Sequence, residues 1–156
     1  MPTQTDPLLE ETIEVDANPA RVWSLVSDVR RMAEWSPQVQ KTFVRGGGPV
    51  QLGSRTVNLN RRGLLVWPTQ AKVVRFDPHR EIALRIKENF TIWSFTLEPT
   101  EAGGTRITQR RETPQGISSL SRRLTDAVLG GQRQFSSELR DGMRQTLQRI
   151  KVEAEA

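Results

Sequence analysis

The sequence contains no cysteine and no tyrosine, and its single histidine is His79. The missing cysteines exclude disulfide bonds, thiolate metal ligands and cysteine nucleophiles. A Ser-His-Asp relay would depend on His79, which lies in Asp77-Pro78-His79-Arg80, a turn pattern between two apolar runs. We therefore expect an exposed turn histidine, and we predict no catalytic residue, no metal site and no cofactor.

Long apolar runs are missing as well. No run approaches the roughly 18 residues of a membrane span, and the stretch from Met1 to Asp6 lacks the charged start and apolar core of a signal peptide. The 156 residues are close to the common size of one domain. We predict a single domain over residues 1–156, and we expect it to be cytoplasmic.

Basic residues outnumber acidic ones by five, and 19 of the 23 basic residues are arginines. A basic surface for a polyanion such as RNA, or for a membrane surface, is one interpretation of this excess. The arginine pairs are scattered, however, with acidic residues between them: Arg30-Arg31, Arg61-Arg62, Arg110-Arg111 and Arg122-Arg123. Scattered pairs favour an ordinary solvated surface, so we do not expect a nucleic-acid partner.

The dominant pattern in the chain is an amphipathic stretch from Ser118 to Glu153. Its apolar residues recur mostly every three or four positions, as on one side of an α-helix: Leu120, Leu124, Val128, Phe135, Leu139, Met143, Leu147 and Ile150. Gly130-Gly131 interrupts the pattern, and each glycine costs about 1 kcal/mol relative to alanine inside a helix. We predict a break there and a helix from about Gln132 to Glu153, whose apolar side another element must cover.

The first 37 residues predict one strand and two short helices. Residues 8–16 alternate as in a strand with one wet face. Asn18 before Pro19 is typical of a helix start, and an apolar stripe follows at Val22, Trp23, Leu25 and Val26. We expect Asp28 to cap a second helix that ends near Trp35, because Ser36 precedes a proline and therefore avoids the helical region.

Six further segments have β-type patterns and are separated by short turns: Val39–Arg45, Arg55–Asn60, Leu64–Phe76, Glu81–Lys87, Phe90–Glu98 and Thr105–Thr113. Short links between neighbouring strands favour an antiparallel meander. The cover available for such a sheet is the long C-terminal helix, with the short helices closing one end. The space between the sheet and this helix is the candidate site.

Three stretches of the sequence resemble the polyketide cyclase/dehydrase and lipid-transport superfamily (SRPBCC), also called START-like or Bet v 1-like. They are Asn18-Pro19-Ala20-Arg21-Val22-Trp23-Ser24-Leu25-Val26-Ser27-Asp28, Met32-Ala33-Glu34-Trp35-Ser36-Pro37, and Leu97-Glu98-Pro99 with Gly103-Gly104-Thr105-Arg106-Ile107-Thr108. The resemblance implies an α+β helix-grip fold with a hydrophobic cavity. In this fold a seven-stranded curved antiparallel sheet wraps around a long C-terminal helix, and two short helices lie between strands 1 and 2.

The resemblance also implies a range of functions, because the superfamily includes lipid carriers, hormone receptors and aromatase/cyclases. Its cyclases are thought to use tyrosines and arginines inside the cavity, and this chain has no tyrosine. We therefore predict that the protein, as a monomer or homodimer, binds or transports a small hydrophobic ligand, namely a lipid or a polyketide-like or aromatic compound. The alternative is an enzyme of the polyketide cyclase, aromatase or dehydratase type.

Strand alternation and the helical stripe predict which side chains face the candidate cavity: Leu59, Trp67, Trp93, Phe95, Ile107, Phe135 and Leu139. Taken singly, each of them is explained more simply by plain core packing. Trp35 at the end of the second short helix is either a wall of the cavity mouth or a packing anchor.

Alternation also places Arg55 and Arg111 on the inward faces of their strands. A buried guanidinium needs a partner, because burying an unpaired charge is costly. A carboxylate or carbonyl of a ligand would serve, and so would Glu34, Glu112 or solvent at the rim. In the enzymatic alternative, one of these arginines polarises a substrate carbonyl.

Overall fold

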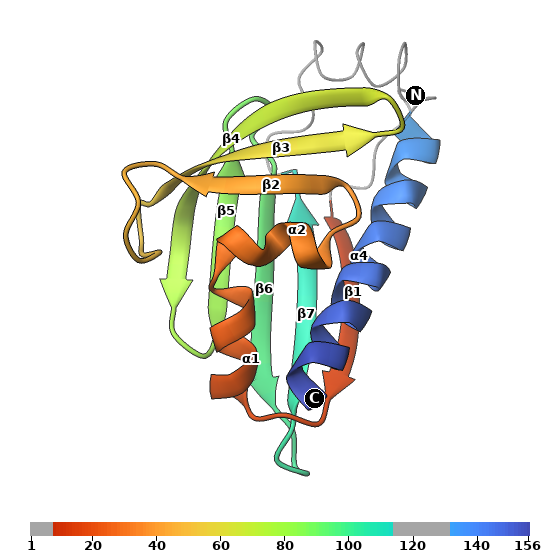
Figure 1. The fold of residues 1–156 in the computed structure, drawn as a ribbon. Helices are drawn as coiled ribbons and strands as arrows, with labels where there is room; N and C mark the ends of the chain where they lie inside the picture. Colours follow the sequence, from red (N-terminus) through yellow and green to blue (C-terminus); the bar gives the residue numbers. More distant parts are fainter. Residues whose placement is uncertain (1–7, 114–131) are drawn as a thin grey trace.

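The structure is a computed structural model that describes residues 8–113 and 132–156. Seven strands form one curved antiparallel sheet, and the long helix α4 runs beside strands β1 and β7 (Figure 1). Two short α-helices, with a 3-10 turn between them, lie between β1 and β2. The predicted helix-grip architecture is therefore confirmed. Within the described ranges, no helix is both long and apolar enough to cross a bilayer.

Strands β2 to β7 form a meander, and the first strand, β1, is added at the β7 edge of this sheet. The strand order is β1-β7-β6-β5-β4-β3-β2, so β1 pairs with the last strand. The strands are β1 (Leu8–Val15), β2 (Val39–Val44), β3 (Arg55–Arg62), β4 (Leu65–Asp77), β5 (Glu81–Ile86), β6 (Ile92–Pro99) and β7 (Thr105–Glu112).

The short helical segments are α1 (Pro19–Val26), a 3-10 turn η1 (Val29–Arg31) and α2 (Met32–Trp35). Asn18 caps α1 as predicted, because its Oδ1 accepts a hydrogen bond from the Arg21 amide at 2.9 Å. The prediction that Asp28 caps the next segment is wrong, since its side chain makes no capping hydrogen bond. Its backbone ψ is 83°, whereas ψ at Asn18 has the extended value of 161° that suits an N-cap.

Helix α4 spans Gln132–Glu155. Its buried side chains follow the predicted stripe: Leu139, Met143, Leu147 and Ile150, with Ala154 one turn further on. The predicted glycine break at Gly130-Gly131 and the apolar positions before it lie outside the described residues.

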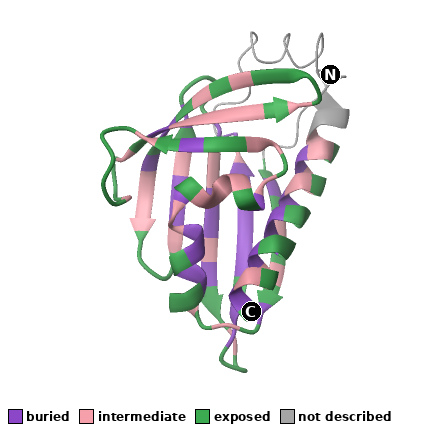
Figure 2. Cartoon of the chain, viewed as in Figure 1, coloured by how far each residue is buried: buried purple, intermediate pink, exposed green. Residues whose placement is uncertain are grey.

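The core consists of two clusters of buried side chains. Figure 2 colours the ribbon purple at all buried residues. The larger cluster joins α1 and the C-terminal half of α4 to the sheet, with Val22, Leu147 and Ile150 among its members. The smaller one contains Leu9, Leu139 and Met143. Because the clusters are separate, the interior beneath the sheet is not one continuous packed mass.

Candidate ligand-binding site

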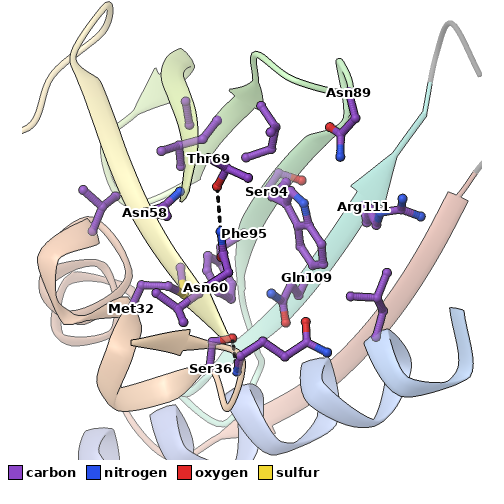
Figure 3. A pocket seen from close by; sticks show the side chains of 18 of the residues that line it. Met32, Ser36, Asn58, Asn60, Thr69, Asn89, Ser94, Phe95, Gln109 and Arg111 are labelled. Atoms are coloured by element: carbon purple, nitrogen blue, oxygen red, sulfur yellow. Dashed lines mark hydrogen bonds between the residues drawn. The ribbon is translucent and has the colours of Figure 1, made fainter. Parts of the chain in front are cut away.

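A cavity of about 190 Å³ opens between the sheet and the helices (Figure 3). Side chains from η1, α2, α4 and all the strands except β1 line it. Its lining includes Phe95 of the larger core cluster and Leu139 of the smaller one. The cavity therefore lies where the two clusters fail to merge.

The main walls of the cavity are apolar and aromatic. Alternate residues of the central strands face inward, as strand geometry requires. They place Trp67 and Ala71 of β4, Leu84 and Ile86 of β5, and Trp93 and Phe95 of β6 on the lining, and Leu139 of α4 faces them. Such a surface suits a ligand with a ring or a short acyl chain.

Polar groups occupy part of the lining, from Asn58 and Asn60 on β3 and from Thr69 on β4. Asn60 Nδ2 donates to Thr69 Oγ1 at 3.0 Å, and Figure 3 marks this hydrogen bond with a dashed line between the two labelled residues. Thr42 Oγ1 donates to Asn58 Oδ1 at 2.8 Å. These hydrogen bonds fix the side-chain amides and leave part of their hydrogen-bonding capacity for a guest molecule.

Two further polar residues, Gln109 and Arg111, face the cavity from β7 (Figure 3). Their exposed fractions are 5 % and 4 %, so both are buried. Gln109 Oε1 has no hydrogen-bond partner. Burial lowers the pKa of the Arg111 guanidinium to about 10, which leaves it charged at neutral pH.

The partners considered for Arg111 from the sequence do not supply its counter-charge. Glu34 is bound by Arg31 at 2.8 Å, and Glu112 accepts from Arg75 at 3.1 Å. Solvent at the rim reaches little of Arg111, whose exposed fraction is 4 %. Among the described residues, the Arg111 side chain has neither an ion pair nor a hydrogen bond, so a buried cation faces the cavity unpaired.

The structure brings five of the predicted site residues together around this cavity: Trp67, Trp93, Phe95, Arg111 and Leu139. Their shared position confirms the predicted direction of these side chains. Their contact with a ligand remains a prediction.

The prediction that Arg55 and Leu59 face the cavity is wrong. Asn58 and Asn60 face the cavity, so the alternate residues of β3 face the other side, and Arg55 is exposed. The turn between β3 and β4 contains two residues, Gly63 and Leu64, which sets Asn60 opposite Trp67. Since directly opposite residues share a face, Leu59 and Trp67 face opposite sides.

Asn58 and Asn60 are two of the lining residues that sequence reasoning missed, as are Leu84 and Gln109. A polar residue in an alternating strand is ordinarily assigned to the solvent side, and the alternation that turns Leu59 inward turns both asparagines outward. The signal that would have found them is the glycine in a two-residue turn, because turn length fixes the register of a hairpin.

Trp35 and Ile107 belong to the larger packed cluster and do not line the cavity. For Trp35 the packing-anchor alternative agrees with the structure, because Arg31 stacks over its ring at 4.7 Å and Arg149 donates to its carbonyl oxygen at 3.3 Å. The side chain of Phe135 lies outside the described part of the chain.

His79 is exposed in the turn between β4 and β5, where its φ is 69°, as expected for a turn residue. It does not line the cavity. Of the described residues that line the cavity, Arg111 alone carries a charge at neutral pH. The described part of the lining therefore contains hydrogen-bonding groups and one cation, with no carboxylate or imidazole for proton transfer.

A curved antiparallel sheet around a C-terminal helix, with a cavity between them, defines a helix-grip protein. The sequence model of the family described as polyketide cyclase / dehydrase and lipid transport matches residues 7–155, and the chain belongs to this family. No curated protein matches the sequence.

Solved structures with the same fold include proteins of different kinds. A polyketide cyclase-like protein from Corynebacterium glutamicum is 24% identical with a TM-score of 0.62, and the match covers 97% of this chain and 91% of that one. The di-domain ARO/CYC BexL from the BE-7585A biosynthetic pathway is 21% identical with a TM-score of 0.71, over 96% of this chain and 50% of BexL. Major latex-like protein 151 from Panax ginseng is 10% identical with a TM-score of 0.66, over 96% and 97%. At these identities the likeness establishes the fold alone.

Proposed function

We propose that the protein binds a small hydrophobic ligand in the cavity between its sheet and helix α4. The observation that carries the proposal is a space of about 190 Å³ walled by Trp67, Trp93 and Phe95. An apolar cavity of about 150 Å³ is large enough for benzene. The ligand is therefore of one- or two-ring size, or an acyl chain of similar volume.

Binding without chemistry agrees with the lining of this cavity. Side chains that commonly transfer protons are carboxylates, histidines, lysines and tyrosines. None of these residue types occurs among the described residues that line the cavity. The remaining polar groups, such as the amides of Asn58 and Asn60, suit the orientation of a ligand.

The proposal is tested by native mass spectrometry of the protein purified directly from its host. We expect a co-purified apolar compound. In parallel, a panel of lipids and aromatic compounds should raise the melting temperature. A ligand at 100 times its Kd adds about 2.7 kcal/mol, or roughly 5–10 °C for a chain of this size. No retained mass together with no thermal shift across the panel would refute the proposal.

A second candidate function is that of a cyclase or dehydratase for a polyketide-like or aromatic substrate. The observation in its favour is Arg111, a charged hydrogen-bond donor held inside the cavity where it can polarise a substrate carbonyl. Arg55, the other arginine considered for this role, is exposed and faces away.

Substitution of Arg111 discriminates between the two functions. If the protein is an enzyme, Arg111→Ala abolishes turnover of such a substrate while its affinity changes little. Arg55→Ala is the matched control, because it removes the same charge outside the cavity. Turnover that survives in Arg111→Ala, or that is absent from the wild type, excludes this enzymatic role.

A further inference from the structure

We infer that the ligand of this cavity is an organic acid whose carboxylate binds the Arg111 guanidinium. The inference rests on the proposed function and deepens it by naming the class of ligand. The expected ligand is a small aromatic or acyl carboxylate, with its apolar body against the aromatic walls and its charge at β7.

The first support is that Arg111 is buried, unlike the other arginines of the described sheet and helices. Arginines of the described residues that form ion pairs with carboxylates at 2.6–3.7 Å include Arg31, Arg62, Arg75, Arg106, Arg110, Arg140 and Arg144. Arg111 is more deeply buried than any of these, yet no described residue pairs with it. A charge buried without a partner is costly, so such a group is commonly kept for a ligand.

The second support is that the acidic groups around β7 are already engaged. Glu112, the next residue, accepts a hydrogen bond from Arg75. On the neighbouring strand β1, Glu10 is bound by Arg110 at 2.6 Å and Glu11 by Arg144 at 3.1 Å. A rearrangement that brought one of them to Arg111 would break an existing ion pair. None of these three carboxylates is therefore free to supply the counter-charge of Arg111.

The third support is the surroundings of the guanidinium. Arg111 is paired with Leu9 of β1 on one side and with Trp93 of β6 on the other. Apolar neighbours exclude water and strengthen an electrostatic contact. The planar guanidinium offers parallel N–H donors that match the two oxygens of a carboxylate.

A single guanidinium also limits the charge of the ligand. Arg111 is the one charged group among the described lining residues, so the cavity neutralises one negative charge. A carboxylate carries one charge, whereas a phosphate monoester carries about 1.5–2 at pH 7. Gln109 faces the same cavity two residues away, so a neutral amide lies beside the proposed carboxylate position.

The experiment compares acids with amides of the same shape by isothermal titration calorimetry at pH 7. The pairs are 2-naphthoate with 2-naphthamide, benzoate with benzamide, and octanoate with octanamide. A hydrogen-bonded charge contributes about 1.5–3 kcal/mol, so we expect the best-fitting acid to bind about 10–100-fold more tightly than its amide. In Arg111→Met this ratio should fall to about one, while Arg55→Met should keep the wild-type ratio.

The outcomes separate the two proposals. If acid and amide bind the wild type equally, or if Arg111→Met keeps the preference for the acid, the inference is wrong while the proposed function stands. If no member of any pair binds, the proposed function fails and the inference fails with it. Arg111→Gln serves as a second variant in case the methionine variant does not fold, and it should lose the preference in the same way.

Discussion

Arg111 on β7 and Trp93 on β6 are directly opposite cross-strand neighbours, and both side chains face the cavity. Directly opposite residues of an antiparallel pair share one face of the sheet. The pair therefore sets a buried cation and a large aromatic surface side by side in the same wall. A guest that satisfies both has a charged end and an apolar body, and the empty protein bears the cost of the unpaired cation.

We predict that Arg111→Met stabilises the ligand-free protein at neutral pH by about 1–3 kcal/mol, because an apolar side chain of similar length replaces a buried charge that no described residue pairs. Urea unfolding of the ligand-free proteins measures the difference. Arg55→Met is the control and should change the free energy of unfolding by less than about 0.5 kcal/mol, since Arg55 is exposed. A marked loss of stability in Arg111→Met would show that the guanidinium has a stabilising partner.

We predict that Ala71→Phe fills the cavity. Ala71 is buried and lines the cavity from β4, so a larger side chain there enters the space proposed for the ligand. The substitution should abolish binding of ring compounds and change stability by less than about 1 kcal/mol. Overpacking of a solid core instead costs about 1–3 kcal/mol. A loss of that size in chemical denaturation, with binding intact, would contradict the position of the cavity.

We predict that Gly104→Ala destabilises the protein by about 1–3 kcal/mol. A Cβ at Gly104 would overlap the backbone oxygen of Val15, which cannot move without disturbing the pairing of β1 with β7. Thermal unfolding measures the effect. Gly103→Asn is the comparison, because Gly103 has a φ of 84° but open space around it, and asparagine tolerates this conformation. Equal losses of stability from both substitutions would mean that backbone conformation, and not the contact with the Val15 oxygen, causes the loss in Gly104→Ala.

We predict a pH-dependent contribution from Glu155. Its carboxylate accepts hydrogen bonds from the Asp16 amide at 2.7 Å and from Lys151 at 2.6 Å, and these contacts lower its pKa. A lowered folded-state pKa gives stability that is present above the ordinary carboxyl pKa and is lost as the pH falls through the folded value. Glu155→Gln should therefore lower the melting temperature at pH 7, and the difference should shrink toward pH 3. Glu101→Gln, in an exposed turn, is the control, and a difference for Glu155→Gln that is constant with pH would contradict the assignment.

Periodicity was sufficient to predict the elements and much of the core. The stripe that ends in Leu147 and Ile150 identifies the buried side of α4. On β4, the two-residue period that sets Trp67 and Ala71 on one side of the strand identifies its inner face. These patterns are readable because burial of apolar surface dominates both elements.

The site was harder to predict, because a binding cavity reverses the usual rule for polar residues. Asn58 and Asn60 face the interior, whereas Leu59 faces away from it. Arg55 is exposed and Arg111 is buried because the registers of their strands, β3 and β7, turn them to different faces. Alternation alone does not reveal the register of a strand.

The four tryptophans provide the most direct measurement of the central claim, that a small ring compound enters the cavity. Trp67 and Trp93 line the cavity, whereas Trp23 and Trp35 are packed in the core cluster. In a nuclear magnetic resonance titration of ¹⁵N-labelled protein with 2-naphthoate, the indole N–H signals of Trp67 and Trp93 should shift and saturate together, while those of Trp23 and Trp35 stay in place. Equal small shifts of all four signals, or none at saturating probe, would contradict the account.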